Sequence, residues 1–421
     1  MARFNPCHSS MNPTTIHRLL PTLALIPLLS LSASAGLVRF TAAIDATQET
    51  TGSTSTATGS AVMIYDVTAN TFDLSVTVND FAGPLTLSHI HEGASGVAGS
   101  PVVNFGTGET NYTRTGDTLT ATFANMDYTG DPATLLAGNA YVNYHTDAWP
   151  GGEVRGQLIP DPVKLTAIIR PEFEIGAHTP VVSDAYGAAQ ATYDPATNMI
   201  TTLVCLYNFT NTLTNSHIHE AAVDASGGVT LGFGGASVYL QNGNTYVQQF
   251  GPSAYPGSPV ALLSEGAYVN AHSDVYTPGE IRGQLYVLDP TDTGRLGNVS
   301  TRGRVGLDDE VLIAGLIVQG ENPVRVLLTA RGPVLTGFNV GTVLADPLLE
   351  VYDAGNHLLF TNDDFGTAPF ASLIAASGVS PTETSESAVL LVLPPGAYTG
   401  IVSGVGGTEG VALAEAFEVA W

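Results

Sequence analysis

The feature that most constrains the fold of this chain is an internal duplication. Residues Tyr141–Leu158 read YVNYHTDAWPGGEVRGQL and residues Tyr268–Leu285 read YVNAHSDVYTPGEIRGQL, with eleven of eighteen positions identical and no gap. The string SHIHE also occurs once ahead of each segment. Self-similarity over this length indicates two copies of one domain, and each copy has to bury a core of its own.

Each copy is expected to consist of β-strands. Apolar and polar residues alternate in FDLSVTV (Phe72–Val78), and turn signals such as Asn-Gly and Asp-Pro recur at short intervals. Charged residues make up only 12% of the chain, which suits strands joined by turns better than charged amphipathic helices. We therefore predict an all-β protein with two tandem Greek-key-like β-sandwich domains, at residues 37–159 and 163–288.

A third unit is expected at residues 294–421. It contains strand-like runs such as VLIAGLIV and VRVLLTAR, but it lacks both the HIH string and the GEIRGQL string. It is therefore not a third copy, and we predict a further β-sandwich of a different kind.

The first 35 residues are expected to be a signal peptide. Arg3 and Arg18 precede an apolar run, Leu19–Leu31, which is followed by the small residues Ala33–Ala35 of a cleavage site. The run is short for a membrane span and contains two prolines, so a retained anchor is the less favoured alternative. We expect no membrane span after cleavage, and a protein that is secreted or held at the cell surface.

The charge of the chain limits its partners. The formal net charge is −25, with only 13 Lys and Arg residues against 38 Asp and Glu residues. Such a surface repels nucleic acid and anionic lipid, so we expect neither as a partner. The partner that we expect is an extracellular protein or a cell-surface component of unknown identity.

Three histidines in each copy form a candidate metal site. Successive side chains of a strand point to opposite faces, so His89 and His91 share one face, and His145 belongs to a later strand. The second copy supplies His217, His219 and His272. Three imidazoles suit Zn²⁺ or copper, which are the two cofactors we consider. The alternative is a hydrogen-bonded histidine cluster that supports a loop.

The sequence does not identify a fourth metal ligand. The carboxylate candidates in the two copies are Glu92, Glu220, Asp147 and Asp274. No catalytic residue is predicted either, because the chain has no nucleophile elbow and no phosphate-binding loop between a strand and a helix. We therefore expect a protein that is not an enzyme.

The GEVRGQL and GEIRGQL strings place a carboxylate and a guanidinium on one strand face. Glu153 and Arg155 are two residues apart, as are Glu280 and Arg282. Such pairs form ion pairs or bind loop backbone, so the favoured interpretation is a structural ion pair that closes the sandwich. The alternative is that the two arginines guide an anion to the histidines.

These motifs resemble a known family. HIHEG followed by YVNYHTDAWPGGEVRGQL resembles the CHRD domain, first recognised in chordin, and HIHEA followed by YVNAHSDVYTPGEIRGQL is similar. The resemblance implies an extracellular β module, associated in chordin with binding of bone morphogenetic proteins. The second copy departs where Ala221 replaces Gly93. In the third unit, RLGNVSTRGRVG, LLEVYDAGNHLLFTNDDF and LPPGAYT resemble a C-terminal β domain of secreted bacterial proteins.

A second resemblance provides the alternative function. Copper/zinc superoxide dismutases are β-sandwiches with an HVHE-like strand, a later histidine and a later arginine, an order that is similar to His89, His91, His145 and Arg155. A bridging histidine is missing, because no further histidine lies between His91 and His145. The prediction is thus an exported, non-catalytic binding or surface protein that holds metal through its histidines. The alternative is a metal-dependent redox enzyme of the superoxide dismutase type.

Overall fold

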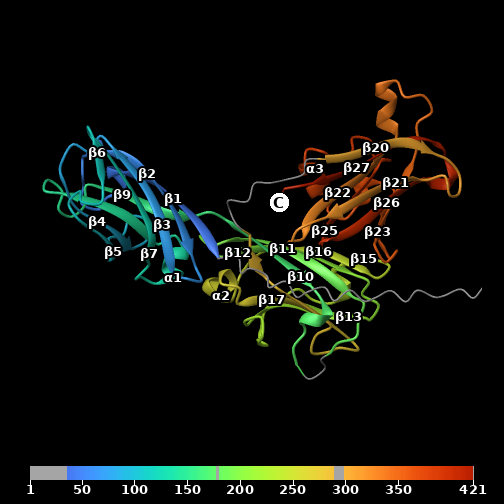
Figure 1. Ribbon diagram of the computed structural model, residues 1–421, viewed down its shortest axis with the longest axis horizontal. Helices are drawn as coiled ribbons and strands as arrows, with labels where there is room; N and C mark the ends of the chain where they lie inside the picture. The colour runs from blue at the N-terminus through green and yellow to red at the C-terminus, as the bar shows by residue number, and fades with distance from the viewer. Residues whose placement is uncertain (1–35, 177–179, 289–297, 421) are drawn as a thin grey trace, which may run out of the picture. The chain divides into compact units, whose positions relative to one another are not determined.

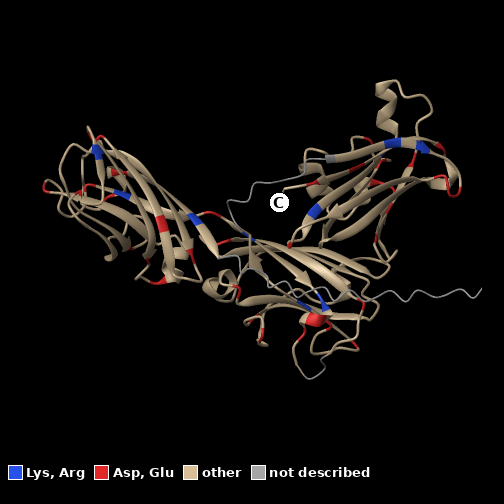
Figure 2. Ribbon diagram, in the orientation of Figure 1, with Lys and Arg blue, Asp and Glu red and all other residues tan. Residues whose placement is uncertain are grey.

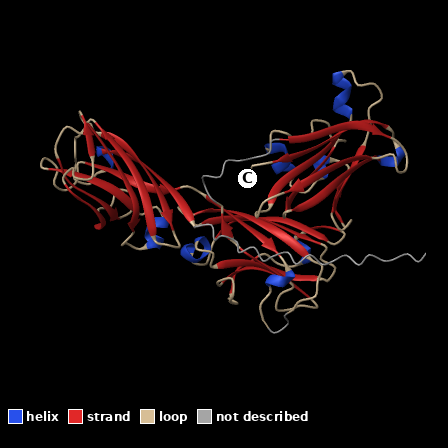
Figure 3. Cartoon of the chain, viewed as in Figure 1, coloured by secondary structure: helices blue, strands red, loops and turns tan. Residues whose placement is uncertain are grey.

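The computed structural model describes residues 36–176, 180–288 and 298–420. The expected signal peptide, residues 1–35, lies outside the described residues. Strands dominate the described chain, and its helices are short, as Figure 3 shows. The predicted all-β class, with two repeated β units and a third β-sandwich, is confirmed.

The first copy forms one strongly curved antiparallel sheet (Figure 1). Its nine strands run in the order β5-β4-β8-β9-β1-β2-β3-β7-β6. They are β1 (Leu37–Asp45), β2 (Thr58–Asp66), β3 (Thr71–Asn79), β4 (Leu85–Glu92), β5 (Ser100–Thr107), β6 (Thr113–Thr115), β7 (Thr118–Asp127), β8 (Ala140–Thr146) and β9 (Val154–Pro160). The connections β3–β4, β5–β6 and β7–β8 cross from one half of the sheet to the other, which is the Greek-key feature of the unit.

Alternation along the strands separates the core from the opposite face. In β3, Phe72, Leu74, Val76 and Val78 are buried, as the FDLSVTV pattern predicts. The β2–β3 hairpin turns at Asn70, whose φ of +57° lies in the left-handed region that asparagine tolerates. A short helix, α1 (Pro132–Leu136), is capped by Asp131 and buries two leucines.

The second copy repeats this arrangement. Its strands are β10 (Val163–Ile169), β11 (Tyr186–Asp194), β12 (Met199–Tyr207), β13 (Leu213–Glu220), β14 (Val229–Gly232), β15 (Leu240–Asn242), β16 (Thr245–Ala254), β17 (Ala267–Ser273), β18 (Ile281–Gln284) and β19 (Tyr286–Val287). The last strand is interrupted at Leu285, so the copy is divided into sheets of six and four strands. The helix α2 (Pro259–Leu263) corresponds to α1.

The third unit is a sandwich of two four-stranded antiparallel sheets, β20-β27-β22-β25 and β21-β26-β23-β24. Its elements are β20 (Asn298–Val305), β21 (Leu312–Val318), β22 (Val324–Arg331), β23 (Pro347–Asp353), β24 (Leu358–Asn362), β25 (Ser387–Leu393), β26 (Gly396–Gly404), β27 (Gly410–Glu418) and the helix α3 (Ala371–Ala376). Acidic residues occur in all three units, and basic residues are sparse (Figure 2). Among the described residues, no helix is both long and apolar enough to cross a membrane.

Candidate functional site

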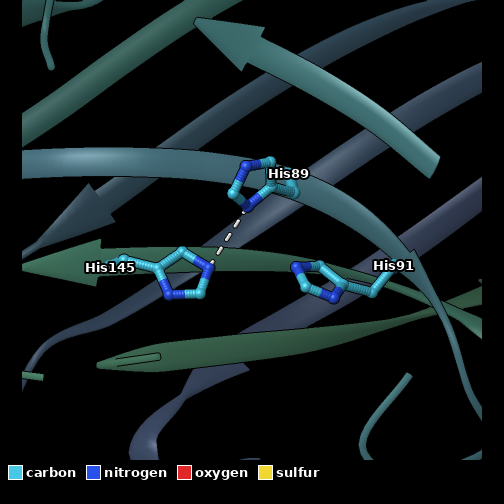
Figure 4. A group of neighbouring side chains, drawn as sticks. All are labelled: His89, His91 and His145. Carbon is cyan, nitrogen blue, oxygen red and sulfur yellow. Dashed lines mark hydrogen bonds between the residues drawn. The ribbon is translucent and has the colours of Figure 1, made fainter. Parts of the chain in front are cut away.

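The three histidines of the first copy meet on the side of the sheet that faces away from its apolar core. Strands β4 and β8 are neighbours, with His89 opposite Asn143 and His91 opposite Tyr141. Ile90, between the two histidines, is fully buried on the core side. Figure 4 shows the three rings turned toward one another. One ring nitrogen of each of His89, His91 and His145 lies within 4.8 Å of the others, and His89 Nδ1 is 3.3 Å from His145 Nε2.

Backbone carbonyls fix the tautomers of two of these rings. His91 Nδ1 donates to the carbonyl oxygen of Gly99 at 3.0 Å, and His145 Nδ1 donates to that of Pro150 at 3.1 Å. A carbonyl oxygen only accepts, so each Nδ1 carries the proton and each Nε2 keeps a lone pair. His91 Nε2 is buried without a hydrogen-bond partner. A buried acceptor in this state costs about 1–3 kcal/mol, so it marks a position suited to a donor or a cation.

The second copy reproduces the cluster atom for atom. His217 Nδ1 is 3.2 Å from His272 Nε2. His219 Nδ1 donates to the Gly227 carbonyl at 3.0 Å, and His272 Nδ1 donates to the Thr277 carbonyl at 2.9 Å. His219 Nε2 is again buried without a partner. The duplication has therefore kept the carbonyl contacts that orient the rings as well as the histidines themselves.

Burial keeps the imidazoles neutral. Burial, together with the neighbouring histidines, lowers the pKa of His89 and of His217 to about 4. Burial also lowers the pKa of His91, His145, His219 and His272, against the raising effect of their carbonyl partners. A metal ligand must be an unprotonated imidazole nitrogen, so at neutral pH all six rings are in the state that binds metal.

Arg155 and Tyr141 form the wall of the first cluster. The Tyr141 ring stacks on His91 with 5.0 Å between centroids, and the Arg155 guanidinium lies 3.3 Å from the Tyr141 centroid. Arg155 donates to the carbonyl oxygens of Val97 and Ala94, each at 2.8 Å. It thereby holds the loop that leads to Gly99, the partner of His91. Arg282 repeats this role with the carbonyls of Ala225 and Ala222 and with Tyr268.

Glu153 and Glu280 do not pair with the arginines that follow them. Glu153 accepts from Ser55 Oγ at 2.8 Å and from Thr146 Oγ1 at 2.6 Å. Glu280 accepts from Ser183 Oγ at 2.6 Å and from Asn211 Nδ2 at 3.0 Å. The favoured sequence interpretation, a Glu–Arg ion pair, is therefore wrong in its partners within the described structure. The arginines donate their hydrogen bonds to loop carbonyls, and the carboxylates accept theirs from hydroxyl and amide groups.

The proposed fourth ligands also lie elsewhere. Strand alternation turns Glu92 to the core side, where it accepts from Tyr128 OH at 3.0 Å and from the backbone N–H of Asp131. Glu220 accepts from Tyr255 OH at 2.8 Å and from Ser258 N at 2.6 Å. Asp147 and Asp274 are exposed beyond the ends of their strands. Among the described residues, no carboxylate or thiol joins either histidine group.

Sequence reasoning missed one residue in each copy. Glu49 and Glu174 lie beside Asn143 and Asn270, the cross-strand neighbours of His89 and His217, and burial raises the pKa of each glutamate to about 7 although Arg155 and Arg282 act to lower it. Both follow the strands that open the two copies, each directly after a short 3-10 helix, within LVRFTAAIDATQET and VKLTAIIRPEFEIG. The sequence signal that could have identified them is a glutamate at the same position of both copies. The pattern does not say which acidic residue of these stretches turns inward.

The fold and its repeated site define a protein of tandem β-sandwich modules, each with a three-histidine cluster. The family model of the CHRD domain matches residues 40–158 and 165–285, and these cover more than half of the chain, which therefore belongs to the CHRD domain family. No curated protein matches the chain. A structure of the Sulfolobus turreted icosahedral virus aligns over 92% of this chain and 82% of the viral chain, at 10% sequence identity. The TM-score of 0.15 is too low to indicate a shared fold.

Proposed function

We propose that this protein is an exported, non-catalytic binding protein in which each CHRD module holds one transition-metal ion, zinc or copper, through its three histidines. The observation that carries the proposal is the convergence of one ring nitrogen from each of three neutral imidazoles, two of which are oriented in each copy by a hydrogen bond to a backbone carbonyl. Export is supported by the signal-peptide pattern and by the extracellular association of the CHRD family.

The spacing of the nitrogens supports a metal site. Two nitrogens bound tetrahedrally to zinc at about 2.0–2.1 Å lie roughly 3.3–3.4 Å apart. The distances between His89 Nδ1 and His145 Nε2, 3.3 Å, and between His217 Nδ1 and His272 Nε2, 3.2 Å, are close to this value. The Gly99 and Pro150 carbonyls act as the outer partners that orient metal-bound imidazoles.

The experiment is a thermal melt of chelator-treated protein, purified without an affinity tag, with and without Zn²⁺ or Cu²⁺ at pH 7.5. We expect either metal to raise the melting temperature, because a ligand at a hundred times its Kd adds about 2.7 kcal/mol per site. His91→Ala together with His219→Ala should abolish the gain. The control His357→Ala, in the third unit, should retain it. Equal melting temperatures with and without metal in the unmutated protein would contradict the proposal.

A copper redox enzyme of the superoxide dismutase type is the second candidate. The observation in its favour is that three protein ligands leave a coordination position for a small molecule. Against it, the N–H groups at the ends of Arg155 are occupied by loop carbonyls, so we assign this arginine a structural role rather than the guidance of an anion. Removal of superoxide by the copper-loaded protein, lost in His91→Ala with His219→Ala, would favour the enzyme.

A further inference from the structure

A half-buried glutamate lies against the hairpin that carries the third histidine of the first module. A Cβ on Gly152 would lie 2.6 Å from Glu49 Oε1 and 2.8 Å from Asn143 Oδ1, so the two oxygens face the same side of this glycine. Gly152 has a φ of +130°, which a larger residue rarely adopts. Both oxygens are buried without a hydrogen-bond partner. The absence of a side chain at Gly152 thus leaves the space that the Glu49 carboxyl group occupies.

The second module repeats the arrangement with different surroundings. Both carboxylate oxygens of Glu174 would lie 2.6 Å from a Cβ on Gly279, whose φ is +148°. Asn270 Nδ2 donates to Glu174 Oε1 at 3.0 Å, while Asn270 Oδ1 is buried without a partner. Asn143 and Asn270 are each 3% exposed. The retained pair of glutamate and asparagine points to a role beyond the packing of one loop.

The charges around the cluster suggest what that role is. Along the ladder, Asn143 has His89 on one side and Arg155 on the other. A divalent cation at the histidines would therefore bind near the charge of Arg155, which is only 1% exposed. Like charges in such a poorly solvated position repel strongly. Glu49 is the carboxylate whose charge acts on Arg155, because Glu153 is bonded to hydroxyl groups.

We infer that Glu49 and Glu174 are positioning residues that supply the negative charge against Arg155 and Arg282, and so allow a divalent cation to bind at each histidine cluster. The inference rests on the proposed function. Neither glutamate is itself a metal ligand, and each changes the affinity of its site rather than the choice of metal.

The test is calorimetric titration of the chelator-treated full chain with Zn²⁺ at pH 8, for the unmutated protein, Glu49→Gln, Glu174→Gln and the double variant. We expect each single variant to weaken one of two sites about tenfold, because it removes a compensating negative charge while the neighbouring arginine keeps its positive one. The unchanged module serves as an internal control. Asp147→Asn removes an exposed charge near β8 and should leave both affinities unchanged.

The stability of the metal-free variants separates a charge role from a structural one. Because burial raises the pKa of Glu49 to about 7, its ionised form costs folding free energy at pH 8. Glu49→Gln should therefore melt no lower than the unmutated protein without metal, although it binds zinc more weakly. The ratio of the two affinities should shrink as pH falls below about 7, where the glutamate takes up a proton.

The outcomes distinguish this inference from the proposed function. Two zinc sites of unaltered affinity in the double variant would overturn the inference and leave the proposed function standing. A matching loss of metal-free stability and zinc affinity in Glu49→Gln would overturn the charge role in favour of a structural one. No zinc binding by the unmutated protein would overturn both.

Discussion

At the scale of single residues, the sites depend on which nitrogen of each imidazole carries the proton. Gly99 and Pro150 take the Nδ1 protons of His91 and His145 and leave both Nε2 atoms facing inward. His89, on the same strand as His91, instead directs Nδ1 inward, where it lies 3.3 Å from His145 Nε2. The three imidazoles therefore direct two kinds of nitrogen toward the centre of the cluster. In His91 and His145 the inward nitrogen is Nε2, because a backbone carbonyl holds the proton on Nδ1.

The buried imidazoles should make the metal-free protein sensitive to acid. The folded pKa of His89 and His217 is about 4, below the ordinary value of 6.5, so below pH 6.5 the unfolded chain takes up protons that the folded chain does not. The free energy of unfolding should then fall as pH is lowered from 6.5 toward 4, by about 2 kcal/mol for each of these two histidines, allowing for partial solvent exposure. Urea unfolding at pH 7.5 and pH 4.5 with a chelator measures the loss. His89→Gln with His217→Gln should reduce it, and an undiminished loss in that variant would assign the acid sensitivity to other groups.

At the scale of elements, the loop between β4 and β5 is held by two side chains from β9. Arg155 donates to two carbonyls of this loop and to Gln157, and Gln157 donates to the Gly93 carbonyl. The loop residue Gly99 in turn holds His91. The GEVRGQL string is therefore connected to the histidines through a loop rather than through a ligand of its own.

Arg155→Lys should destabilise the fold and weaken metal binding together. Lysine has no planar fork for two carbonyls and does not stack on Tyr141 as a guanidinium does. We expect a loss of about 2 kcal/mol in the free energy of unfolding, measured by urea at pH 7.5, since buried hydrogen bonds from a charged donor are lost. Arg39→Lys is the matched control, because the Arg39–Asp161 ion pair is 40% and 43% exposed at its two side chains and should cost less than about 0.5 kcal/mol. Similar losses in the two variants would show that the loop does not depend on Arg155.

At the scale of the whole molecule, the sequence by itself determined the all-β class, the duplication and the facing of the histidines. Periodicity of two and turn chemistry are local properties, so they can be read without the fold. The proposed boundaries of the signal peptide and the domains stay predictions.

The tertiary structure decided the hydrogen-bond partners of the acidic residues: Glu153 bonds to Ser55, and Glu92 turns toward Tyr128. It also decided that Glu49 reaches Gly152, about a hundred positions along the chain. Such contacts join residues far apart in sequence, and the choice among several nearby carboxylates depends on which space the folded backbone leaves open.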